Sequence, residues 1–237
     1  MIRTDLATLP YDLSQFDQEA LLRYLKVSIP WLSGFSKSPV YDTVNEICNA
    51  VLDVDSEEDR LGRVAELYCR LLPRKILTSW KLYGINPTAG LALDCPTLLE
   101  HIVAALHVPD YGVRPAWHTL EGVFYAALVI EDHESWPSKH TVVCVALWSG
   151  LPLLAVHAVG ASIERRFQVA LNAALISDPA VPLDGIYEDL DGAFCAGRRM
   201  LACLCERLSQ KTRPDDALPP LNSDKNQVIG YDKSPHC

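Results

Sequence analysis

The chain lacks the sequence signatures of the common nucleotide-binding, serine-hydrolase and zinc-binding classes. Its 237 residues contain no GxxxxGK[ST], no GxGxxG and no GxSxG motif, and its eight cysteines form no CxxC. Cys203 and Cys205 form a CxC, but no second Cys or His pair lies near them at the spacing of a zinc site. We therefore expect no metal site and no cofactor.

Basic charge and long apolar runs are also scarce. The 21 Lys and Arg residues are outnumbered by 30 Asp and Glu residues, which gives a net charge of −9. Phosphate binding needs concentrated basic side chains, so this balance excludes a typical nucleic-acid partner. The richest apolar run, residues 142–159, is interrupted by Gly150 and Pro152. We expect no membrane association, no secretory signal and a cytoplasmic location in which the cysteines are reduced.

What the sequence does contain is typical of a globular α+β protein. Apolar residues make up 49% of the chain and charged residues 22%. Apolar periodicity predicts helices over 18–27, 41–52, 56–72, 76–83, 96–106, 162–176 and 187–208, and strands over 122–130, 141–148 and 153–159. The expected fold has a helical N-terminal third, a small antiparallel sheet of about three or more strands, and helices packed after it.

The domain organisation follows from the same pattern. We expect residues 1–210 to form a single globular domain, helical over 1–90 and with an α+β core over 91–210. From Lys211 the composition becomes polar and rich in proline. Such a segment buries too little apolar surface to offset the entropy of ordering it, so 211–237 is predicted to be a disordered C-terminal tail.

A cysteine at the start of a predicted helix is the most informative single feature. Cys95 lies between Asp94 and Pro96, just before the apolar periodicity of 96–106 begins. Proline is favoured at the first helical position, which would make Cys95 the N-cap. The partial positive charge of a helix N-terminus favours a thiolate, and the free backbone N–H groups could bind an oxyanion. Cys95 is therefore a candidate nucleophile.

Histidines at predicted strands supply the other groups that thiol catalysis needs. His140 begins the strand 141–148 and is the candidate general base and acid. A base must itself be oriented by an acceptor. His157, on the following strand, and Asp132, before the loop that leads to His140, are the two candidates for that role, and the sequence leaves both open.

This order of a cysteine on a helix and a histidine on a strand resembles the papain-like cysteine superfamily in its rearranged forms. These include transglutaminase-like proteins, arylamine N-acetyltransferases and NlpC/P60-type hydrolases. The resemblance covers roughly residues 85–160 and rests on Asp94-Cys95, His140 and His157. The chain departs from these families at the third position, usually Asp, and lacks the Ser-Gly that follows the cysteine in NlpC proteins. The resemblance implies acyl transfer by a peptidase, amidase, transglutaminase or acyltransferase on a peptide or small-molecule substrate.

A non-catalytic function is the alternative. Cysteine is among the most buried residue types, and the other seven cysteines are interpreted as structural. In that case the protein is a cytosolic binding or assembly factor that docks a protein partner through its helical N-terminal third. Aromatic residues near the ends of those helices either complete a core or anchor the interface with a partner or a second copy in a homo-oligomer; they are Trp31, Phe35, Tyr41, Trp80 and Tyr83. The acidic stretches 132–134 and 184–191 have ligand types that could bind a divalent cation, but acidic loops are usually only solvated, and we interpret them so. The substrate, the partner and the oligomeric state are not readable from the sequence.

Overall fold

The computed structural model describes residues 9–15, 18–32, 40–74, 77–85, 94–107, 112–132, 139–158, 160–175 and 180–211. The chain divides into two compact units, Met1–Gly197 and Arg198–Cys237. The described part of the second unit is 198–211, which continues a helix that begins in the first. The predicted domain boundary at residue 210 stays a prediction, and the predicted tail beyond Lys211 lies outside the described residues.

Helices and strands of the described residues follow the order expected of an α+β chain. They are α1 (Leu9–Ser14), α2 (Gln18–Ser28), η2 (Pro30–Leu32), α3 (Val40–Leu52), α4 (Glu57–Leu71), η3 (Leu72–Arg74), β1 (Trp80–Gly84), α6 (Cys95–Leu106), β2 (Val113–Leu120), β3 (Val123–Asp132), β4 (Lys139–Trp148), β5 (Leu153–Ala158), α7 (Ala161–Leu175), β6 (Val181–Tyr187) and α8 (Leu190–Lys211). The helical N-terminal third is confirmed.

The six strands form one antiparallel sheet in the order β2-β3-β4-β5-β1-β6. Strands β2 to β5 follow one another as a meander, and β1 returns to the far side of β5, where it also pairs with β6. The α+β class is confirmed, and the sheet is larger than the three strands that the sequence located.

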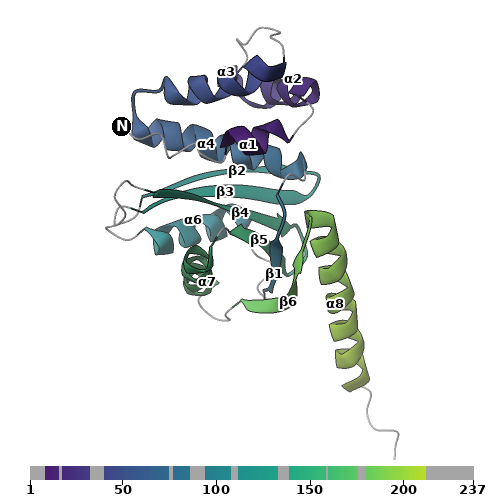
Figure 1. Ribbon diagram of the computed structural model, residues 1–237. Helices are drawn as coiled ribbons and strands as arrows, with labels where there is room; N and C mark the ends of the chain where they lie inside the picture. The colour runs from purple at the N-terminus through teal and green to yellow at the C-terminus, as the bar shows by residue number, and fades with distance from the viewer. Residues whose placement is uncertain are drawn as a thin grey trace, which may run out of the picture. The chain divides into compact units, whose positions relative to one another are not determined.

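Both faces of this sheet are covered by helices, as Figure 1 shows. One face, here the α4 face, packs against α4, with α1, α2 and α3 beyond it; its strand side chains include Ala127, Val129, Cys144, Ala146 and Ala155. The other, the α6/α7 face, packs against α6 and α7; its strand side chains include Ala126, Leu128, Val143, Val145 and Val156. Successive strand residues point to opposite faces, so alternate positions of one strand belong to separate cores.

Local signals explain why α4 begins where it does. Ser56 is the N-cap with an extended backbone, and its hydroxyl accepts a hydrogen bond from the Asp59 backbone N–H at 3.3 Å. Three acidic residues in the first turn complement the positive end of the helix dipole. The buried face of α4 includes Leu67 and Leu71, each with no exposed surface. This helix matches the prediction for 56–72.

Three parts of the sequence-based assignment are corrected. The predicted helix over 76–83 is wrong, because Trp80–Gly84 forms the strand β1. Trp80 and Leu82 pack into the core of the α4 face, and Tyr83 packs into the core of the α6/α7 face. Side chains that alternate between the two faces are typical of a strand. Strands β2 and β6 were not predicted at all. The helix predicted from residue 187 begins at Leu190, since Tyr187 still belongs to β6.

The turn between β2 and β3 contains a residue in an unusual conformation. Leu120 pairs with Val123, so the loop consists of Glu121 and Gly122, whose φ angles are +50° and +76°. Positive φ at both positions is the type I′ hairpin turn, which favours Asn-Gly. Glutamate lacks the short polar side chain with which asparagine and aspartate hydrogen-bond locally in the left-handed region, so it meets the full steric cost of that region. The same hairpin would therefore be more stable with a residue at position 121 that tolerates the left-handed conformation.

Replacing Glu121 by asparagine should stabilise the protein, because asparagine tolerates the left-handed conformation. We expect Glu121→Asn to add about 0.5–1 kcal/mol to the free energy of unfolding and to raise the Tm by about 1–4 °C. Thermal unfolding followed by circular dichroism measures the change. Glu188→Asn, an exposed site outside the turn, is the control and should leave the Tm unchanged. A lower Tm for Glu121→Asn would contradict the turn assignment.

Candidate functional site

Cys95 is the first residue of α6, and Asp94 before it is the N-cap. The Asp94 carboxylate accepts a hydrogen bond from the Thr97 backbone N–H at 3.2 Å, so the predicted cap is shifted by one residue. The Cys95 side chain is half-buried and packs against the core of the α6/α7 face. Burial raises the pKa of its thiol, and the neighbouring Asp94 carboxylate raises it further. These surroundings favour the thiol over the thiolate.

His140 lies on the opposite face of the sheet from Cys95. Its Nε2 atom is 3.6 Å from Glu131 Oε1, and its side chain is only 3% exposed. One ligand atom each of His140, Glu131 and Glu57 lie within 4.8 Å of one another, and Glu57 belongs to α4. His140 therefore faces α4, whereas Cys95, the first residue of α6, packs against the core on the other face of the sheet. The structure does not bring this sulfur and imidazole together, because the sheet lies between them.

Of the two candidate orienting residues, His157 also lies on the face of the sheet away from Cys95. His157 is on β5, where its Nδ1–H donates to the Thr78 carbonyl at 2.6 Å and its ring packs at a tilt on Trp80, with centroids 5.8 Å apart. Burial lowers the pKa of His157. Asp132 ends β3, and its backbone pairs with Lys139. The catalytic roles of Cys95, His140, His157 and Asp132 stay predictions, with no Cys95–His140 pair formed.

A different cysteine–histidine pair, which sequence reasoning missed, is buried on the α4 face. Cys69 Sγ of α4 is 3.2 Å from His118 Nδ1 of β2 and 3.4 Å from the Tyr125 carbonyl oxygen. Burial raises the pKa of Cys69 to about 12 and lowers that of His118 to about 4. Both groups are therefore neutral near pH 7, unlike a catalytic thiolate–imidazolium pair. This contact is a polar link between helix and sheet.

Glu57, Glu131 and His140 are the described residues whose ligand atoms could hold a divalent cation. Carboxylate oxygen and imidazole nitrogen are suitable ligands for zinc or manganese. The negative charge of Glu57 already has two favourable interactions. A guanidinium nitrogen of Arg60 is 3.5 Å from Glu57 Oε1, and Glu57 lies in the first turn of α4, at the positive end of the helix dipole. Glu57 thus has cationic partners within the chain itself.

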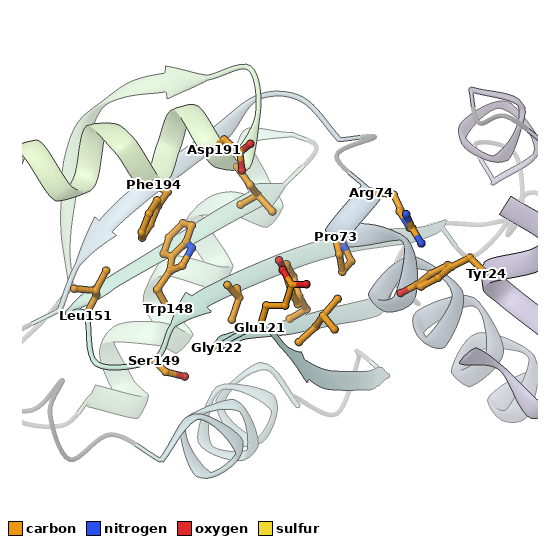
Figure 2. Close-up of a pocket in the computed structure, with 14 residues that line it drawn as sticks. Tyr24, Pro73, Arg74, Glu121, Gly122, Trp148, Ser149, Leu151, Asp191 and Phe194 are labelled. Atoms are coloured by element: carbon orange, nitrogen blue, oxygen red, sulfur yellow. The ribbon is translucent and has the colours of Figure 1, made fainter. Parts of the chain in front are cut away.

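A groove lined by aromatic side chains lies where the sheet's turns meet the N-terminal helices (Figure 2). Its volume is about 890 Å³ and it is open to solvent. We call it the aromatic groove. It is lined by α2 and η3, the β2–β3 and β4–β5 turns, and the start of α8, through Tyr24, Pro73, Arg74, Leu120, Glu121, Gly122, Val123, Tyr125, Trp148, Ser149, Leu151, Leu190, Asp191 and Phe194.

The rings and charges of the aromatic groove are arranged by these elements. Trp148 and Phe194 are in contact, with ring centroids 5.3 Å apart. The Arg74 guanidinium lies 4.1 Å from the centroid of the Tyr24 ring, a cation–π contact. Burial raises the pKa of Tyr125, and the carboxylates of Glu121 and Asp191 raise it further. The groove thus combines an aromatic surface with charges of both signs.

Comparison of the chain with protein-family models and with curated proteins finds no match in either. Within the residues that the structure describes, no helix has the length and apolar character needed to cross a membrane.

The reactivity of Cys95 separates a catalytic thiol from a packed one. Because burial and Asp94 raise its pKa, we expect brief treatment with iodoacetamide near neutral pH to label Cys95 more slowly than the exposed Cys195. Peptide mapping by mass spectrometry reports both sites in one sample. Labelling of Cys95 ahead of Cys195 would instead support the nucleophile hypothesis.

The neutral Cys69–His118 pair predicts a loss of stability in acid. The pKa of His118 is about 4 in the folded protein, below its usual value of 6.5, so the unfolded state binds a proton first as the pH falls. The contribution of His118 to the free energy of unfolding is fully present above pH 6.5. It falls by roughly 3 kcal/mol as the pH is lowered towards 4.

Urea unfolding at a series of pH values measures this dependence. His118→Gln should lose less stability than the wild type over that interval, since glutamine does not titrate. His101→Gln, at an exposed histidine of α6, is the matched control and should follow the wild type. Parallel curves for all three proteins would show that His118 titrates normally.

Proposed function

We propose that the protein is a non-catalytic binding protein that holds a segment of a protein partner in the aromatic groove. The observation that carries this proposal is an open groove lined by the aromatic rings of Tyr24, Tyr125, Trp148 and Phe194, where the helical N-terminal third borders the sheet. Tyr24, Pro73 and Arg74 belong to the helical N-terminal third, although the groove is not lined by the aromatic residues that the sequence singled out there, of which Trp80 and Tyr83 are buried.

The side-chain types in the groove suit a protein partner. Tryptophan, tyrosine and arginine dominate the binding energy of protein interfaces, because they offer large contact areas and polar tips. Arg74 and Tyr24 are already held against each other, so part of the ordering cost of binding has been met before a partner arrives. The groove's volume of about 890 Å³ is near the upper end for small-molecule pockets, and its open side suits an extended chain.

The thiol groups support the non-catalytic side of the proposal. Burial raises the pKa of Cys69 as well as that of Cys95, and neither thiol lies beside a charged imidazole. The competing hypothesis, acyl transfer by Cys95 with His140, requires a rearrangement that brings two faces of the sheet together. The cytoplasmic location, the absence of nucleic-acid partners and self-association stay predictions.

Substitution of Trp148 tests the groove. When the protein is purified from its native cells, we expect one partner to co-purify reproducibly with the wild type. Trp117→Ala and Cys95→Ala should retain this partner, and Trp148→Ala should lose it. Trp117 is the matched control, a 52% exposed tryptophan of β2 that does not line the groove. With the purified partner, Trp148→Ala should weaken binding by about 30-fold or more, the size of a 2 kcal/mol hot spot.

A second variant keeps the result interpretable if Trp148→Ala lowers stability. Arg74 is exposed, so Arg74→Ser leaves the core intact and should also weaken binding. Retention of the partner by both groove variants, together with its loss in Cys95→Ala, would reverse the assignment and favour the catalytic hypothesis.

A further inference from the structure

We propose that the aromatic groove selects a partner segment in which a large apolar side chain is directly adjacent to a lysine or arginine. This inference rests on the proposed function and names the chemistry of the partner.

The apolar specificity comes from one end of the groove. Trp148, Phe194 and Leu151 lie together there in Figure 2, with the Trp148 and Phe194 rings in contact. A large apolar side chain that covers these rings removes apolar surface from water on both partners. A small side chain such as alanine leaves most of that surface exposed, so it cannot act as the anchor.

The charged specificity comes from the carboxylates beside the rings. Glu121 and Asp191 come from different elements, the β2–β3 turn and α8, yet both line the same groove as Tyr125. In Figure 2 Glu121 lies between Trp148 and the Tyr24–Arg74 pair. A cation bound next to the apolar anchor therefore meets these carboxylates, at the end of the groove away from Arg74. This asymmetry fixes where the basic residue sits.

The conformation of Glu121 gives independent support. Its φ of +50° lies in the left-handed region, where asparagine or glycine would make the same turn at lower cost. What glutamate offers that these residues do not is a carboxylate on a longer side chain at the edge of the groove. Strained residues of this kind cluster at ligand-binding positions. We infer that the hairpin gives up stability to place this charge.

Other occupants fit the groove less well. An acidic segment would face two carboxylates, Glu121 and Asp191, against the single guanidinium of Arg74. The net charge of −9 opposes acidic partners more generally and favours encounter with basic ones. Charge complementarity therefore points to a cationic segment.

Three short peptides test this selection on the full-length protein. They have the sequence acetyl-Gly-Ser-Gly-X-Z-Gly-Ser-Gly-amide, with X-Z as Trp-Lys, Trp-Glu or Ala-Lys, and NMR titration measures even weak binding. We expect the Trp-Lys peptide to bind about fivefold or more tightly than the Trp-Glu peptide, with a preference that falls as ionic strength rises. The Ala-Lys peptide should bind least.

Glu121→Gln isolates the charge, because it keeps the size and backbone strain of the residue. We expect it to lower the preference for Trp-Lys over Trp-Glu by at least half, while Glu188→Gln, at an exposed glutamate that does not line the groove, leaves it unchanged. Equal binding of Trp-Lys and Trp-Glu, tighter binding of Trp-Glu or Ala-Lys, or no binding of any peptide would each overturn the inference. The proposed function would still stand in those cases if Trp148→Ala released the native partner.

Discussion

Burial of the sheet on both faces is the constraint on which the rest of the structure depends. Residues 126–130 of β3 and 143–146 of β4 are at most 1% exposed, and alternate residues enter separate cores. A strand in this position cannot carry an open reactive site along its length, because each central side chain is enclosed by helices. A site that is open to solvent can therefore form only at the ends of the strands. The aromatic groove lies at such an end, beside the β2–β3 and β4–β5 turns.

Burial of the sheet on both faces also determines the protonation and the separation of the cysteine and histidine side chains that pack against it. Cys69 and His118 are linked across the interface between helix and sheet, where burial favours the neutral form of each. Cys95 and His140 belong to opposite faces, so the layer that gives the protein its core also separates them. In the aromatic groove, by contrast, burial does not favour the neutral forms, because the charged side chains are exposed. These are Arg74, Glu121 and Asp191.

The elements that could be predicted are those whose own pattern decides their structure. Helical periodicity located α2, α3, α4, α6 and α7, and runs of buried apolar residues located β3, β4 and β5. Strand β2 was missed because Pro115 interrupts it and Trp117 is exposed, and β6 because most of its residues are exposed and its pairing shifts beside β1. Without β2 neither the Cys69–His118 contact nor the groove could be anticipated. The groove also draws on segments from Tyr24 to Phe194, which only the topology brings together.

The five tryptophans allow the central claim, that partners bind in the aromatic groove, to be tested directly. In a ¹⁵N-labelled sample each indole N–H gives its own resonance. Trp80 donates to the Leu77 carbonyl inside the core, Trp117 lies on β2 outside the groove, and Trp148 lines it. On addition of the Trp-Lys peptide we expect the Trp148 indole resonance to shift while those of Trp80 and Trp117 stay in place. A shift confined to Trp117, with Trp148 unmoved, would contradict that claim.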